Sequence, residues 1–354
     1  MMSTMLDYIE QESEALTVIL QEYQQKLAPV KAYLETRPVN KIMILATGSS
    51  YNAALCARYY FEEHFGILVD IKEPYNFTYY ERVDPATDMV IAVTQSGKSS
   101  STLAAMKKVQ ALSIPVFCLT SSPASPAAKQ ADGILDINTG LESVGYVTRG
   151  FSATVLNLLL IALMVAENRG LVTQAERAES LASLKDAAQA IPGVIDKTNA
   201  FIIRHRQHFI QASRFVAIGY GALTGVAKEC ETKFTETVRL PSGGFELEAY
   251  MHGPYLEANA SHTLFFIEDR PHARSAALRD YMRPAVDAVF TVTLAAENND
   301  ENTLALDFPL THNFAPLLLI VPFQLLAFNI SAAKGIDLSV RIFDDFDKVL
   351  KSKI

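Results

Sequence analysis

The stretch Lys41-Ile-Met-Ile-Leu-Ala-Thr-Gly-Ser-Ser50 decides the fold class of this chain. An apolar run that ends in glycine and serine is typical of a parallel strand buried on both faces of its sheet. Helical patterns lie on either side of this run, and similar runs return downstream. The expected helices are residues 4–34, 52–65 and 148–168, and the expected further strands are residues 68–71, 88–94, 115–120 and 133–138. Strands that alternate with helices predict a doubly wound parallel sheet with helices on both faces.

The same order of strand, glycine turn, helix and strand begins again after residue 213. We expect a strand at residues 215–219, a helix at 223–237 and a long helix at 314–334. The sequence therefore predicts an α/β protein of two tandem, flavodoxin-like domains related by a distant duplication. The predicted parts are an N-terminal helix at 1–36, a first domain at 37–170, connecting helices at 171–212, a second domain at 213–338 and a tail at 339–354.

Composition narrows the possible partners and the compartment. The 31 basic and 39 acidic side chains give a net charge of −8, which disfavours nucleic acid because such a partner needs a clustered basic face. The three cysteines stand singly, which favours a reducing compartment, and the N-terminus lacks a signal-peptide pattern. Two apolar runs, residues 155–166 and 315–327, are shorter than the ~20 residues of a membrane span and are expected to form buried core helices. We expect a soluble, cytoplasmic protein with no membrane partner.

Two hydroxyl-rich turns follow predicted strands and open predicted helices. Ligands of open α/β sheets bind at the carboxyl ends of strands, where helix amides attract an anion and hydroxyl groups add donors. The turns therefore predict a phosphate site, although serine and threonine also cap helices without binding anything. Neither turn matches a P-loop or a GxGxxG fingerprint, which disfavours a nucleotide. The predicted phosphate ligands are Thr47, Gly48, Ser49, Ser50, Thr94, Gln95, Ser96 and Ser99.

A second group of residues has the chemistry for proton transfer. Lys233 and Glu236 are three residues apart and share one helix face, and His252 lies before Gly253-Pro254 at a turn. Aldose–ketose interconversion needs a base for the C1/C2 proton and a donor for the oxygen, and a carboxylate and a histidine supply these. On spacing alone, Lys233 and Glu236 also fit an exposed salt bridge. The other histidines form no HxH or HExxH pattern, so we expect no metal and no cofactor.

These motifs resemble those of the sugar isomerase (SIS) family over nearly the whole chain. The chain is similar to the isomerase half of glucosamine-6-phosphate synthases and to deglycases of fructoselysine- or glucoselysine-6-phosphate. The resemblance implies that both turns bind phosphate, that Glu236 is the catalytic base, with Lys233 in the same motif, and that His252 completes the site of a neighbouring subunit. It implies further that the segment containing Glu142 and Arg149 lines the sugar site. The tail departs from the family pattern, and Lys348 is either its Schiff-base lysine or a solvated residue.

The resemblance implies a homodimeric enzyme that cleaves or isomerises a 6-phosphorylated ketose or ketose-amine (Amadori) compound. Two alternatives stay open, an aminosugar-phosphate ketose/aldose isomerase and a non-catalytic sensor that binds a sugar phosphate. The segment before the first predicted strand is short and no cysteine follows the first methionine. We therefore expect no glutaminase half, no glutamine-derived ammonia and no DNA-binding head.

Overall fold

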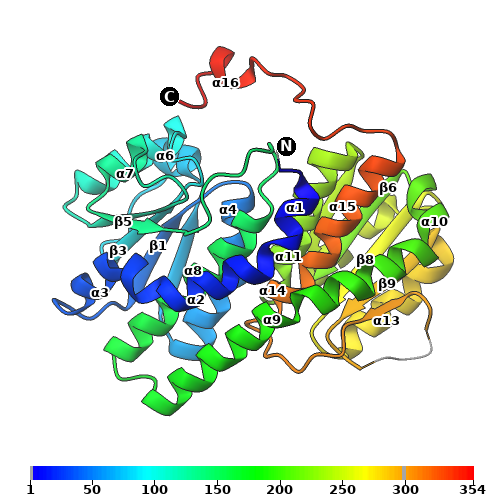
Figure 1. Ribbon diagram of the computed structural model, residues 1–354, viewed down its shortest axis with the longest axis horizontal. Coiled ribbons are helices and arrows are strands. Elements are labelled where there is room, and N and C mark those ends of the chain that lie inside the picture. Colours follow the sequence, from blue (N-terminus) through cyan, green and yellow to red (C-terminus); the bar gives the residue numbers. More distant parts are fainter. Residues whose placement is uncertain (1–2, 297–299) are drawn as a thin grey trace. The chain divides into compact units, whose positions relative to one another are not determined.

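The computed structural model describes residues 3–296 and 300–354 (Figure 1). It divides into two compact units, which are treated separately below. The first unit comprises Glu14–Lys185 and Arg341–Ile354, and the second comprises the residues up to Ser13 and Asp186–Val340. The boundaries predicted above follow the order of strands along the chain. This division follows packing instead, so it splits helix α9 (Gln174–Arg204) and assigns the C-terminal tail to the first unit.

The first unit is built on a parallel five-stranded sheet in the order β2-β1-β3-β4-β5. Helices lie on both faces of this sheet (Figure 1). The strands are β1 (Lys41–Leu45), β2 (Leu68–Lys72), β3 (Met89–Val93), β4 (Val116–Thr120) and β5 (Gly133–Asp136). The helices of this part of the chain are α2 (Glu12–Lys26), α3 (Ala28–Leu34), α4 (Ser49–Tyr59), η1 (Tyr60–His64), α5 (Pro74–Tyr80), α6 (Ser100–Gln110), α7 (Pro126–Gln130) and α8 (Arg149–Asn168); α16 (Phe346–Val349) lies in the tail.

The register of the paired strands aligns the apolar side chains that form the core of the first unit. Met43 pairs with Val90 and Val90 with Val116, so apolar side chains of three neighbouring strands point to the same face. This row packs against α5 and α6, where Phe77 and Met106 are fully buried. Strands covered by helices on both faces have no side that needs polar residues, which is why their sequences read as continuous apolar runs.

The second unit repeats the topology of the first. Its parallel sheet has the order β10-β9-β8-β6-β7, which matches the first sheet strand for strand when it is counted from β7. The strands are β6 (Arg214–Gly219), β7 (Ser242–Glu246), β8 (His262–Glu268), β9 (Ala288–Thr293) and β10 (Thr303–Ala305). The helices of this part of the chain are α1 (Met5–Glu10), α10 (Arg206–Gln211), α11 (Leu223–Lys233), η2 (Phe234–Val238), α12 (Leu247–Met251), η3 (Pro254–Glu257), α13 (Ala273–Met282), η4 (Arg283–Ala285), α14 (Pro316–Leu319) and α15 (Val321–Ala333). The predicted fold class, two tandem parallel α/β domains, is confirmed.

Four local predictions need correction. The helix expected at 4–34 is divided into α1, α2 and α3 at Gln11 and Leu27. The helix expected at 314–334 is broken into α14 and α15, because Pro322 has no N–H to continue the helical hydrogen bonds. The helix expected at 223–237 changes at Lys233 from α11 into the π-helix η2. Strand β7 was not predicted, since Gly243-Gly244 looks like a turn. A side chain at Gly244 would come within 2.2 Å of the Ala227 carbonyl oxygen, so this glycine lets β7 approach α11 closely.

Two helices are long and apolar enough to cross a membrane by length and composition. They are Arg149–Asn168 and the stretch Pro316–Ala333, which extend beyond the apolar runs seen in the sequence. In the structure, 94% and 78% of their apolar windows are buried. Both therefore pack as core helices, as predicted.

Candidate functional site

The two hydroxyl-rich turns of the first unit follow neighbouring strands. Strands β1 and β3 pair in parallel, with Leu45 opposite Ala92, although β2 lies between them in the sequence. The chain leaves β1 toward β2 on one side and later enters β3 on the other, which makes this strand pair the topological switch point of the sheet. Ligands of open α/β sheets bind outside the carboxyl ends of strands at such a point. The structure thus brings Thr47–Ser50 and Thr94–Ser99 to one edge.

The first turn leaves the start of helix α4 uncapped. Gly48 precedes the helix with a φ of +59° and supplies no side-chain cap. The first helical hydrogen bond of α4 runs from the Asn52 amide to the Gly48 carbonyl oxygen, at 3.0 Å. In residues 3–296 and 300–354, the amides of Ser49, Ser50 and Tyr51 have no acceptor. Such amides, together with the positive end of the helix dipole, favour an anion at this position.

Some residues of the second turn hold its shape by hydrogen bonds, and others have hydroxyl groups free to bind a ligand. Ser99 caps helix α6 by accepting from the Thr102 amide, and the Gln95 side chain donates to the Gly150 carbonyl and the Thr154 hydroxyl. These two predicted phosphate ligands therefore hold the turn in place. Among the predicted phosphate ligands, Thr47, Ser49, Ser50, Thr94 and Ser96 have hydroxyl groups that find no protein partner in the part of the chain that the structure describes. A phosphate role for any of them stays a prediction.

Gly97 is required in the second turn for two reasons. Its φ is +63°, and a Cβ atom there would lie 1.9 Å from the Ser125 hydroxyl oxygen. We expect Gly97→Ala to lower the free energy of unfolding by about 2–5 kcal/mol, from left-handed backbone strain and overpacking together. Gly66→Ala is the matched control, because Gly66 has a φ of +64° but open space around it, and should cost only about 1–2 kcal/mol. Urea unfolding of both variants measures the difference, and equal losses would contradict the predicted clash.

Glu142 and Arg149 organise the loop that precedes helix α8. The two carboxylate oxygens of Glu142 accept from the amides of Thr148 (2.9 Å) and Gly150 (2.6 Å) and so cap this helix. Arg149 donates to the Thr139 carbonyl oxygen at 2.6 Å. These three hydrogen bonds stabilise the loop and the start of α8, and the place of Glu142 and Arg149 in a sugar site stays a prediction.

In the second unit, Lys233 lies in a buried ionic network. Its ammonium is 2.6 Å from the Glu236 carboxylate and 3.5 Å from that of Glu229. The side chains of Lys233 and Glu229 are fully buried, whereas 37% of the Glu236 side chain is exposed. The alternative of an exposed salt bridge is therefore wrong for Lys233. Glu229 was not predicted, although its spacing of four residues from Lys233 was visible in the sequence.

Glu236 lies in the π-helix η2, which follows α11 directly and ends at Arg239 with a φ of +59°. Segments of π-helix are rare and are often found at functional sites. The wider turn carries Glu236 away from the regular helical position while Lys233 stays in α11. The Glu236 carboxylate is thus accessible to solvent. It contacts Lys233, whose ammonium also contacts the buried Glu229 carboxylate.

His252 lies at the C-terminal end of α12 and is exposed. Gly253 follows with a φ of +136°, and Pro254 opens η3. In the described residues, no hydrogen bond or ion pair involves the His252 ring. The histidine is therefore available to a molecule outside this chain, and its catalytic role stays a prediction.

At the switch point of the second sheet, between β6 and β8, lie side chains that are far apart in the sequence and belong to no recognisable motif. The Ala222 amide, at the start of α11, donates to His312 Nε2 at 3.0 Å, and His312 Nδ1 lies 3.3 Å from Asp269. Tyr220 donates to the same carboxylate at 2.9 Å. Burial acts to raise the pKa of Asp269, but the hydrogen bonds from His312 and Tyr220 outweigh it and hold that pKa below its usual value. The two sheets therefore share a topology but not the chemistry at their strand ends.

The end of the C-terminal tail lies against the second turn. Amide and hydroxyl groups of Ser100 donate to the carbonyl oxygens of Ser352 and Lys351 at 3.0 Å, and the Ile354 amide donates to the Lys98 carbonyl oxygen. Lys348 is exposed in α16, upstream of these contacts. Its role as a Schiff-base lysine stays a prediction.

Comparison with known proteins finds a family match for part of the chain. The family model of the SIS domain matches residues 36–166, which contain both hydroxyl-rich turns. This match places a SIS domain at these residues of the first unit. A curated relative, the glutamine–fructose-6-phosphate aminotransferase (isomerizing) of Gloeobacter violaceus, is 27% identical in a 308-residue alignment that covers 84% of this chain and 50% of the relative. The chain thus spans about half the length of the curated relatives it matches.

Solved structures extend the similarity to both units. A Clostridium difficile 630 protein, provisionally described as a phosphosugar isomerase, superposes with a TM-score of 0.91 and 25% identity over 99% of both chains. The C-terminal domain of the glucosamine-fructose-6-phosphate aminotransferase of Francisella tularensis has a TM-score of 0.83 and 18% identity, covering 94% of this chain and 96% of that domain. At that identity the second likeness shows the fold alone.

Proposed function

We propose that this chain is a sugar-phosphate enzyme that cleaves or isomerises a 6-phosphorylated ketose or its amine adduct by proton transfer between C1 and C2. One observation carries the proposal. The uncapped start of α4 at the β1–β3 switch point offers free amides and hydroxyl groups to a phosphate. The buried network around Lys233, with Glu236 open to solvent, supports the catalytic half of the proposal.

The phosphate would be held by the amides of Ser49 and Ser50 and by the hydroxyl groups of Ser49, Ser50, Thr94 and Ser96. Gln95 and Ser99 would keep the second turn in shape. An acidic protein needs such local donors, because its net charge of −8 repels the anion at long range. The curated relatives are named for fructose 6-phosphate, which supports a six-carbon sugar phosphate as the substrate.

Glu236 would remove the proton from one carbon of the C1/C2 pair and return it to the other, through an enediol or enaminol. Lys233 would orient the carboxylate through the 2.6 Å contact between the two side chains. His252 of a second chain would protonate the ring oxygen or the leaving amine. With an Amadori substrate, the shifted imine would then take up water and release an aldose phosphate and a free amine, with no net oxidation. We propose a cytoplasmic homodimer, in keeping with three buried free cysteines.

Ligand binding and turnover can be tested separately. We expect sugar 6-phosphates to raise the melting temperature, since a ligand at 100 times its Kd adds about 2.7 kcal/mol of stability, and the same sugars without phosphate to have no effect. Amine detection on the stabilising 6-phosphorylated Amadori compounds should then show release of free amine. Interconversion without amine release would favour the aminosugar-phosphate isomerase. Stabilisation without any turnover would identify a sensor and contradict the enzyme.

A further inference from the structure

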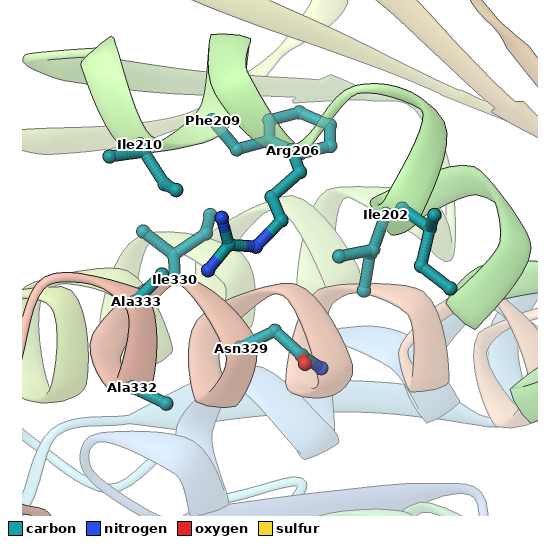
Figure 2. Close-up of a pocket in the computed structure, with 9 residues that line it drawn as sticks. Ile202, Arg206, Phe209, Ile210, Asn329, Ile330, Ala332 and Ala333 are labelled. Carbon is teal, nitrogen blue, oxygen red and sulfur yellow. The ribbon is translucent and has the colours of Figure 1, made fainter.

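A groove in the second unit is lined mainly by apolar side chains. It lies between the α9–α10 junction and helix α15, and its lining residues are Ile202, Ile203, Arg206, Phe209, Ile210, Asn329, Ile330, Ala332 and Ala333. Figure 2 shows the Arg206 side chain reaching toward α15, where Asn329 and Ile330 lie. Ile203 is 74% exposed, which is unusual for a large apolar residue beside other apolar residues.

The size of the groove argues for side chains of a protein rather than a small metabolite. Its volume is about 280 Å³ and it is open to solvent on one side. Pockets for small ligands usually measure about 300–1,000 Å³ and enclose most of the ligand. An open, apolar groove beside helices is instead typical of surfaces that receive an amphipathic peptide segment.

The C-terminal tail is a segment of that kind. Phe343 is 76% exposed, Phe346 54% and Leu350 60%, and helix α16 buries none of its residues. The polar contacts of the tail are satisfied elsewhere, since Asp347 binds Lys353 and Ser352 within the tail. Backbone hydrogen bonds to residues 98–100 hold the end of the tail, so residues 342–350 present their apolar side chains outward.

The charges of the groove and of the tail are also complementary. Both walls of the groove, residues 200–212 and 321–334, contain arginine or lysine and no aspartate or glutamate. The tail carries three aspartates between its aromatic residues, at positions 344, 345 and 347. In the described part of the chain, Arg206 and Asp345 have no ion-pair partner. An acidic, aromatic segment therefore complements a basic, apolar groove.

We propose that residues 342–350 of one chain dock in this groove of a second copy of the same chain. Every copy carries one groove and one tail, so a two-fold dimer would exchange two such contacts. Phe343 and Phe346 would serve as apolar anchors, and the aspartates would lie near Arg206. The groove contains none of the proposed catalytic residues, and the docked segment includes only the candidate tail lysine, Lys348. The test therefore measures the contact between chains and not enzyme activity.

Disulfide trapping between two single variants tests the contact. Ile203→Cys and Phe343→Cys change exposed side chains, and the natural cysteines are all buried, with burial raising the pKa of Cys118 to about 12. Full-length Ile203→Cys and Phe343→Cys chains, carrying different affinity tags, are mixed and oxidised. We expect a cross-linked dimer in which mass spectrometry finds residue 203 of one chain joined to residue 343 of the other. Adding Arg206→Glu to the Ile203→Cys chain should reduce this product several-fold.

Leu112→Cys is the matched control for Ile203→Cys, since Leu112 is an exposed apolar residue of the first unit. Its mixture with Phe343→Cys should give no comparable product. Absence of the 203–343 cross-link would overturn the proposal, as would a yield unchanged by Arg206→Glu. A chain carrying both cysteines that cross-links within itself at monomer mass, with no product in the mixture, would show that the tail docks on its own chain.

Discussion

Glu236→Gln is expected to abolish turnover while sugar-phosphate binding survives. The amide keeps the size of the side chain and its contact with Lys233, but it cannot accept the C1/C2 proton. A positioned proton-transfer group is worth about 10²- to 10⁴-fold in rate, so the loss should fall in that range. The measurement pairs a turnover assay on the substrate found in the ligand panel with thermal shift by the same sugar phosphate. Loss of rate without loss of binding would separate the base from the phosphate site.

The control for this variant is Glu10→Gln, which changes an exposed carboxylate of the same unit and should leave the rate unchanged. If Glu236→Gln retains the wild-type rate, Glu236 is not the base and the proposed mechanism is wrong. If binding is lost with the rate, the carboxylate contributes to holding the substrate instead.

Lys233→Met is expected to destabilise the second unit by about 3–5 kcal/mol. The substitution removes the ammonium that the buried Glu229 carboxylate contacts, and breaking one side of a buried ion pair leaves a poorly compensated charge. Methionine keeps the length of the side chain, so the effect reports charge more than volume. Urea unfolding followed by circular dichroism measures it.

Lys228→Met is the matched control, because Lys228 lies on the same helix and pairs with Glu231 at 3.0 Å on the surface. An exposed pair of this kind is worth about 0–1 kcal/mol. A second variant, Lys233→Met with Glu229→Gln, should recover part of the lost stability, since the buried carboxylate is then neutral. A loss below 1 kcal/mol for Lys233→Met alone would show that the network is not the stabilising feature described above.

Local sequence was sufficient to predict most strands and helices, but it did not predict strand β7 or the break before α15. The runs after Lys41 and Asp88 predict buried strands because covering helices remove the need for polar residues on either face. Strand β7 escaped prediction because Gly243-Gly244 has the composition of a turn, and only the approach of α11 makes glycine necessary there. The break before α15 depends on Pro322, whose missing N–H is a local signal that the sequence contains.

The features of the candidate site also divide into those that local sequence predicts and those that depend on long-range contacts. The hydroxyl-rich turns, Lys233-x-x-Glu236 and His252 are residue types at fixed spacing, so the chain alone predicts the kind of chemistry. The neighbouring positions of β1 and β3, the burial of Lys233 against Glu229, and the hydrogen bonds by which Gln95 and Ser99 hold their turn follow only from the folded structure. Residue types and short spacings are properties of the chain, whereas strand order, burial and hydrogen-bond partners depend on contacts between residues far apart in sequence.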